Sequence, residues 1–286
     1  MDTIGAARTW AIHVLEQAGV EPATLTADLL LAFVLGWDRV QVLTRAETQL
    51  QPESHARFTE LIARRSKGEP LQYLTGEQEF YGLKFRVTPE VLIPRPETEI
   101  LVEKAIDLAG EVRGRPVRFV DVGTGSGCIS VAVAQALPGS LSCAIDISMP
   151  ALTIARENAQ RHGVLGRIQF LCCDLLGGVA SEPSFDMILS NPPYVADTEY
   201  NSLPVMVRDH EPHPALFAGR RGTDVQRRLI PQVGSRLHAG GYLLMEIGLG
   251  QPDTVTQLIR QGGLSLEGIL DDLQGIPRCV VARKIG

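Results

Sequence analysis

Residues 118–127 read Arg-Phe-Val-Asp-Val-Gly-Thr-Gly-Ser-Gly, and this stretch decides the fold. Its first five residues predict a buried strand, and the three glycines predict a tight turn into a helix. Bare backbone and free N–H groups at a helix start suit a nucleotide-like ligand. The dinucleotide fingerprint would require glycine or alanine at 128 or 130, where Cys128 and Ser130 stand. The loop therefore favours a nucleoside that carries an amino acid.

Strand and helix patterns alternate on the C-terminal side of this loop. We predict strands at residues 118–122, 141–147, 168–173, 185–190, 242–247, 265–270 and 279–285, and helices at 126–137, 150–162, 224–238 and 251–260. Such alternation predicts a mostly parallel sheet covered on both faces. The last two strands lack a helix between them, which indicates an antiparallel hairpin at the sheet edge. The expected fold class is α/β, with a Rossmann-like seven-stranded sheet.

The N-terminal quarter of the chain has a different pattern. Apolar residues recur at helical spacing between Ile4 and Ala18, and a second helix is predicted at residues 24–35. Residues 79–87 change to a period of two, which indicates a hairpin. We therefore predict three segments: a helical bundle at 1–76, a β-hairpin linker at 77–92 and a catalytic domain at 93–286.

Composition excludes several classes of protein. The chain has 286 residues, of which 44% are hydrophobic and 21% charged, so it is neither disordered nor collagen-like. Its net charge of −6 disfavours non-specific nucleic-acid binding. The longest apolar stretch, residues 29–35, is far shorter than a membrane span, and no secretion signal is evident. We therefore expect a cytoplasmic protein with no membrane partner.

Acidic residues stand at the ends of the next two predicted strands. Asp146 can accept hydrogen bonds from both hydroxyls of a ribose, although an ordinary helix-start residue before Pro150 would look the same. Asp174 and Leu175 can supply a hydrogen-bonding edge and an apolar wall for a purine, or they can simply end a strand. Spacing alone leaves both alternatives open.

The fourth predicted strand leads into Asn191-Pro192-Pro193-Tyr194. Two successive prolines stiffen the loop and prevent both helix and ladder pairing. The Asn191 side-chain oxygen and a proline carbonyl are two acceptors, which match the two hydrogens of a planar NH₂ group. Tyr194 offers a flat face for stacking. A plain proline-rich turn is the alternative.

The Gly loop, the acid and Asn-Pro-Pro-Tyr, in this order, resemble the class I S-adenosylmethionine-dependent methyltransferases that act on planar nitrogens. Within them, the whole chain resembles the HemK/PrmC family of peptide chain release factor glutamine methyltransferases. Its most specific motifs are residues 68–76 with 80–82, then 92–99 and 190–194. Two positions depart from the family pattern: Cys173 stands where glycine is frequent, and residues 219–222 replace a more acidic segment.

The resemblance implies the cofactor, the substrate and the site. The cofactor is S-adenosyl-L-methionine; its methionine part lies on Gly123, Thr124, Gly125, Ser126 and Gly127, its ribose on Asp146 and its adenine beside Asp174 and Leu175. The catalytic residues are Asn191, Pro192, Pro193 and Tyr194, and Asn191 also borders the cofactor. The substrate is the glutamine of the Gly-Gly-Gln motif in class I release factors. We expect a monomer with no direct nucleic-acid substrate and no metal, since His210 and His213 have no evident third ligand.

Other functions remain open at this point. A methyltransferase for a glutamine in a ribosomal protein would use the same loop, and so would an enzyme that methylates an amino group of a nucleic acid, such as that of adenine. A non-catalytic binding module would leave Asn-Pro-Pro-Tyr unexplained. Arg64, Arg65 and Lys67 form a basic cluster that is either a solvated helix end or a partner contact.

Overall fold

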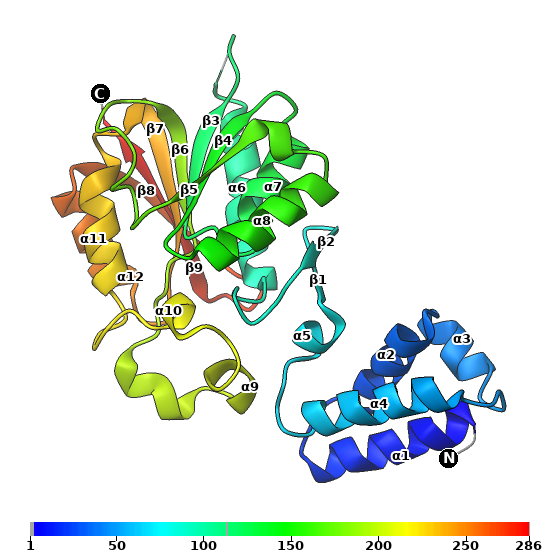
Figure 1. Cartoon of the computed structure of the whole chain (residues 1–286). Coiled ribbons are helices and arrows are strands. Elements are labelled where there is room, and N and C mark those ends of the chain that lie inside the picture. Colours follow the sequence, from blue (N-terminus) through cyan, green and yellow to red (C-terminus); the bar gives the residue numbers. More distant parts are fainter. Residues whose placement is uncertain (1–2, 113, 286) are drawn as a thin grey trace. The chain divides into compact units, whose positions relative to one another are not determined.

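The computed structural model describes residues 3–112 and 114–285 as two compact units, whose elements are labelled in Figure 1. The first unit runs to Glu77 and also takes in Pro204–His210. The second unit comprises Gln78–Leu203 and the chain from Glu211 onward. No helix in the described part of the chain combines the length and apolar character that crossing a membrane requires.

The first unit is helical. Side-chain caps begin two of its helices: Thr3 accepts from the Ala6 N–H, and Asp38 forms a capping box with Gln41. Apolar side chains such as Leu15, Leu30 and Phe58 form a buried core of its own. The helices of this unit are α1 (Ile4–Gln17), α2 (Ala23–Leu35), α3 (Arg39–Thr44), α4 (Pro52–Arg65), α5 (Leu71–Thr75) and α9 (Val205–Arg208).

The second unit is built on a seven-stranded sheet, which confirms the predicted fold class. The strands are β3 (Arg118–Val122), β4 (Leu141–Asp146), β5 (Ile168–Cys172), β6 (Phe185–Ser190), β7 (Leu237–Glu246), β8 (Leu264–Asp271) and β9 (Pro277–Lys284). Their order is β5-β4-β3-β6-β7-β9-β8; β9 pairs antiparallel with both β7 and β8, and the other pairs are parallel. A separate hairpin of β1 (Glu77–Phe80) and β2 (Leu83–Arg86) precedes the sheet.

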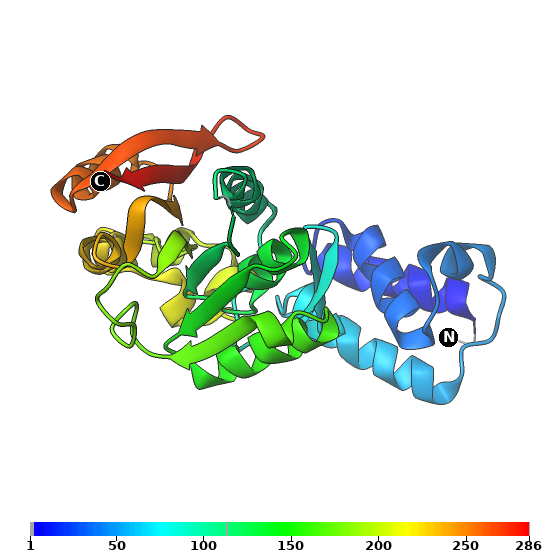
Figure 2. The ribbon, with the colours of Figure 1, turned by 90° about the horizontal axis from the view of Figure 1, so that it is seen from above.

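Successive residues of each strand point to opposite faces of the sheet, so two apolar cores form. Phe119 belongs to one core and Val120 to the other, and the same alternation separates Leu189 from Ile188. Figures 1 and 2 show helices on both faces. Residues of α6 (Glu99–Ala109), α7 (Cys128–Ala136) and α8 (Met149–Arg161) pack into the first core, and residues of α11 (Asp224–Val233) and α12 (Pro252–Gln261) into the second.

One predicted boundary is wrong. The helix predicted at 224–238 ends at Val233, and β7 already begins at Leu237. Leu237 pairs with Phe185, and the register shifts before Tyr242 pairs with Met187. Gly240 and Gly241 lie within this irregular part of the strand, and such glycines hide a strand from a pattern search. The remaining helices are short: η1 (Pro96–Thr98), η2 (Leu165–Arg167), η3 (Asp197–Ser202) and α10 (His213–Leu216).

The strand order reverses at β3. From there β4 and β5 extend the sheet to one side, and β6 and β7 extend it to the other. In open parallel sheets, a crevice forms at such a switch point beyond the carboxyl ends of the strands. The Gly loop follows β3 and Asn191 follows β6, so both lie at this crevice.

Candidate active site

A cavity of about 460 Å³ lies at this crevice, within the second unit. Its walls come from the loops that follow β3, β4, β5 and β6 and from residues 90–98. This volume is in the range of small-molecule sites. The predicted residues that line the cavity are Gly123, Thr124, Gly125, Ser126, Asp146, Asp174, Leu175, Asn191, Pro192 and Pro193. Gly127 and Tyr194 lie outside that lining, so their direct roles stay predictions.

The Gly loop presents bare backbone to the cavity. A Cβ at Gly125 would have no neighbour within 4 Å, and one at Gly123 would meet only the Asn191 carbonyl at 4.0 Å. All three glycines have a positive φ, but only at Gly127 would a Cβ be crowded, since it would stand 3.0 Å from that of Ala155 in α8. Two glycines therefore leave space for a ligand, and the third allows close packing.

Asp121, inside β3, anchors the loop, and the sequence reasoning missed it. Its Oδ2 accepts hydrogen bonds from the Thr124 hydroxyl at 2.6 Å and the Ser130 hydroxyl at 2.9 Å. Its Oδ1 is buried and has no partner among the described residues. Burial raises the pKa of this carboxyl to about 6. A carboxylate within a run of buried strand residues is unusual, and that signal could have identified it.

Asp146, at the end of β4, faces the cavity from the next loop. Its Oδ2 accepts from the Gly125 N–H at 2.9 Å, and its Oδ1 accepts from the Ser148 N–H at 2.9 Å. Burial raises its pKa, and these backbone hydrogen bonds oppose the shift. A carboxylate oxygen can accept more than one hydrogen bond, so both oxygens keep capacity for hydroxyl donors.

Asp174 and Leu175 border another part of the cavity. The Asp174 carboxylate forms an ion pair with Arg228, which also lines the cavity. Leu175 has a positive φ of 51°, which is rare for a residue with a branched side chain. The backbone thus holds Leu175 in a conformation that the surrounding structure must stabilise.

The Asn-Pro-Pro-Tyr loop is held by a buried carboxylate on β7 that the sequence did not predict. Glu246 accepts hydrogen bonds from the Thr98 hydroxyl at 2.6 Å and the Tyr194 hydroxyl at 3.2 Å. Thr98 in turn accepts from Asn191 Nδ2 at 3.0 Å. Burial raises the pKa of Glu246 to about 7, and burial beside this carboxylate also raises the pKa of Tyr194. Tyr194 is thus anchored through its hydroxyl.

His210 and His213, for which the sequence shows no third metal ligand, belong to different units of the structure. Glu211, between the two histidines in sequence, is buried and bonded to Arg95 and to the Ile93 N–H. The ring of His213 stacks on Phe217 with centroids 4.3 Å apart. Within residues 3–112 and 114–285, no group of three or more His, Cys, Asp or Glu side chains could hold a metal ion.

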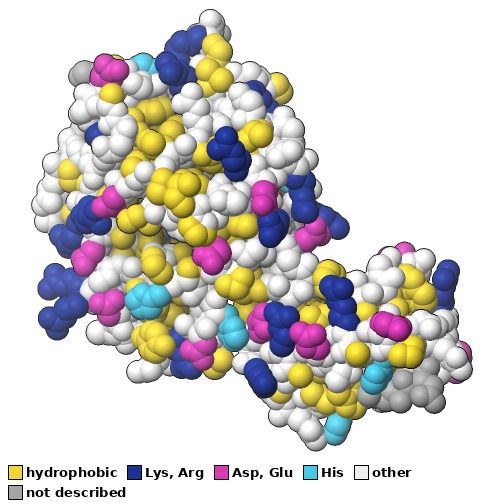
Figure 3. Space-filling model, viewed as in Figure 1, with side chains coloured by type: hydrophobic (Ala, Val, Ile, Leu, Met, Phe, Trp, Pro, Cys, Tyr) yellow, Lys and Arg dark blue, Asp and Glu magenta, His cyan; other side chains and the backbone are white. Residues whose placement is uncertain are grey.

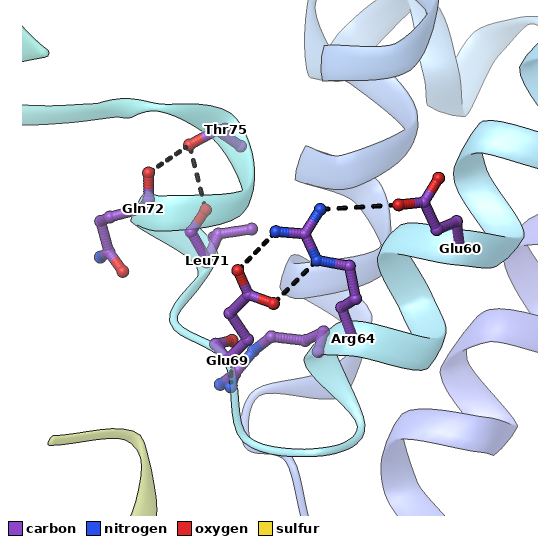
Figure 4. A network of polar contacts seen from close by, with 7 residues as sticks. Glu60, Arg64, Glu69, Leu71, Gln72 and Thr75 are labelled. Carbon is purple, nitrogen blue, oxygen red and sulfur yellow. Dashed lines mark hydrogen bonds and ion pairs between the residues drawn. The ribbon is translucent and has the colours of Figure 1, made fainter. Parts of the chain in front are cut away.

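Two arginines of the basic cluster, Arg64 and Arg65, have hydrogen-bond partners within the first unit. Figure 4 shows Arg64 between two carboxylates, with Nη2 2.6 Å from Glu69 and Nη1 3.6 Å from Glu60. Arg65 is buried and donates to the Glu69 carbonyl at 3.1 Å. Arg65 therefore presents no charge at the surface, and Arg64 presents a compensated one.

Two family models match parts of the chain. Residues 6–76 match the model of the PrmC N-terminal domain, and residues 98–209 match that of the methyltransferase small domain. The chain is 46% identical to the release factor glutamine methyltransferase of Koribacter versatilis (strain Ellin345), covering 96% of each chain. It is 39% identical to the enzyme of the same name from Geobacter sulfurreducens, covering 99% of this chain and 97% of that one.

A solved structure supports the fold. The hMettl16 catalytic domain in complex with an RNA hairpin matches with a TM-score of 0.58 at 18% identity, covering 82% of this chain and 83% of that chain. At this identity, the likeness concerns the fold of the chain alone.

Proposed function

The chain belongs to the family of release factor glutamine methyltransferases, and from that premise we propose that it methylates the glutamine of the Gly-Gly-Gln motif in class I release factors. The methyl donor is S-adenosyl-L-methionine, which supplies an electrophilic methyl group on a sulfonium. We further propose that the enzyme acts as a monomer in the cytoplasm, where release factors work.

The space, the hydrogen-bond acceptors and the apolar wall of the cavity fit this cofactor. Gly123 and Gly125 leave room against bare backbone, and Asp146 offers acceptors for two ribose hydroxyls. Leu175 supplies an apolar wall. We propose that these residues, with Thr124, Ser126 and Asp174, hold the cofactor.

The observation that carries the proposal is that Asn191 and the two prolines line the same cavity as the Gly loop. An amide nitrogen is a poor nucleophile because its lone pair is delocalised into the carbonyl. Two acceptors on its hydrogens, the Asn191 side-chain oxygen and a proline carbonyl, would fix its distance and angle to the methyl group. Catalysis would then rest on positioning and electrostatic stabilisation. On transfer, the nitrogen would gain the methyl group as the bond between that group and sulfur breaks, S-adenosylhomocysteine would leave, and one of the two nitrogen protons would pass to solvent.

The surface charge of the second unit bears on the choice between a protein and a nucleic-acid substrate. Acidic and basic side chains are interspersed on the face of the second unit shown in Figure 3, whereas binding to a phosphate backbone favours a continuous basic patch.

The experiment that tests the substrate is transfer of radiolabelled methyl from S-adenosylmethionine to a purified class I release factor. The matched substrate carries Gln→Ala in its Gly-Gly-Gln motif, and DNA and ribosomal proteins serve as further acceptors.

We expect label on the intact release factor and none on its Gln→Ala form. Label on a ribosomal protein or on DNA instead would overturn this choice of substrate. Absence of label on every acceptor would favour the alternative that the protein is a non-catalytic binding module.

A further inference from the structure

The hydrogen bonds around Asn191 have a direction that follows from chemistry. An ionised carboxylate can only accept hydrogen bonds. At pH 8, above its pKa of about 7, Glu246 is ionised and therefore takes the single hydroxyl hydrogen of Thr98, over 2.6 Å. With its hydrogen committed, the Thr98 oxygen can only accept from Asn191, whose carboxamide must turn its NH₂ group toward Thr98.

This direction decides what Asn191 presents on its other side. The carboxamide is planar, so with Nδ2 on Thr98 the Oδ1 atom points elsewhere. That oxygen has no hydrogen-bond partner among the residues that the structure describes, and Asn191 lines the cavity. A carboxamide turned the other way would set its NH₂ against the NH₂ of a substrate amide, donor against donor.

We propose that Thr98 and Glu246 are positioning residues that hold the Asn191 carboxamide with its oxygen toward the substrate amide. The inference rests on the proposed function, and it gives a role to the Pro94–Glu99 stretch that the function alone leaves unexplained. Thr98 ends the short helix η1 and is 2% exposed, while Glu246 ends β7 and is 1% exposed. Glu246 lies outside the cavity lining, and Thr98, which lines the cavity, joins it to Asn191 through two hydrogen bonds. Through these bonds both residues act on the Asn191 carboxamide.

The test compares Thr98→Val, which keeps the shape and removes the hydroxyl, with Thr98→Ser, which keeps the hydroxyl. At pH 8, where Glu246 is ionised, methyl transfer to release factor gives kcat, and calorimetry gives the cofactor Kd. We expect Thr98→Val to lower kcat at least ~10-fold and Thr98→Ser to stay within about threefold of wild type. The cofactor Kd should change less than about twofold in both. Wild-type kcat in Thr98→Val, or equal losses in both variants, would overturn the proposal.

A replacement variant and a second measurement cover the cases in which the kinetic test fails. Should Thr98→Val fail to bind cofactor, Thr98→Ala takes its place with the same expected outcomes. Should the wild-type protein transfer no methyl to release factor, the proposed function fails, and the network is judged by NMR. The Asn191 side-chain amide signals, identified by their absence in Asn191→Ala, should shift in Thr98→Val and stay in Thr98→Ser. Unshifted signals in Thr98→Val would overturn the network.

Discussion

The side-chain amide of Gln251 donates a hydrogen bond to the backbone carbonyl of Tyr194 over 2.9 Å. The same nitrogen donates to the Gly222 carbonyl at 2.8 Å, and the side-chain oxygen accepts from the Gly248 N–H at 3.0 Å. Gln251 is buried, so one side chain satisfies three backbone groups that water cannot reach. It thereby fixes the end of the Asn-Pro-Pro-Tyr loop.

Replacing Gln251 by leucine should destabilise the second unit. The change keeps the volume but leaves two carbonyls and one N–H buried without partners, at a cost of about 3 kcal/mol. Denaturant unfolding measures the difference from wild type. Gln274→Leu, at an exposed position in the turn before β9, is the matched control and should change stability little. A loss for Gln251→Leu no larger than for the control would contradict this account.

Asp146→Asn should weaken cofactor binding. The substitution removes the charge that strengthens hydrogen bonds from ribose hydroxyls, and we expect the Kd to rise at least ~10-fold. Isothermal titration calorimetry with S-adenosylmethionine measures this. Asp253→Asn, at an exposed residue in the first turn of α12, is the control. Unchanged affinity in Asp146→Asn would remove the ribose assignment.

The sheet could be predicted from the sequence because its signals are local. The predicted strands at 118–122 and 185–190 match β3 and β6 residue for residue, since turn residues bound each apolar run. The start of β7 could not be predicted, because glycines at 240 and 241 break its pattern. The association of Pro204–His210 with the first unit has no local signal either, because it depends on contacts distant in sequence.

The site also contains residues that the sequence predicted and residues that it did not. The residues lining the cavity stand at strand ends and beside glycines or prolines, where spacing indicates their place. Thr98 lies in the motif at 92–99 and Glu246 ends β7, but no local pattern shows that the two meet, because their hydrogen bond joins residues 148 positions apart. Glu246 also follows five buried residues of β7, so only the rarity of a buried carboxylate could have singled it out.

Asn191→Ala should abolish transfer and leave cofactor binding intact. It removes an acceptor that positions the substrate nitrogen, and losses of this kind are typically on the order of 10²–10³ in kcat. Transfer assays and calorimetry on the same preparation measure both quantities. Asn201→Ala, at an exposed position in η3 ten residues later, is the control and should keep wild-type kcat. Wild-type turnover in Asn191→Ala would refute the role of its side chain.

Glu246 should also make stability depend on pH. Burial is the largest cause of its pKa of about 7, while hydrogen bonds from Thr98 and Tyr194 and the charge of Arg278 act in the opposite direction. The negative charge of Glu97 raises the pKa further. Because this value lies above the ordinary 4.5, the folded protein holds a proton that the unfolded chain has already lost.

The stabilising contribution of that proton is fully present below pH 4.5 and is lost as the pH rises through about 7. It amounts to at most about 3 kcal/mol. The glutamine of Glu246→Gln cannot titrate. The free energy of unfolding of this variant should therefore fall less between pH 5 and pH 8 than that of the wild-type protein. Asp121, whose pKa of about 6 is raised by burial, titrates in both proteins and cancels from the comparison. Denaturant unfolding at the two pH values measures the difference, and equal pH dependence in both proteins would show that Glu246 is already ionised at pH 5.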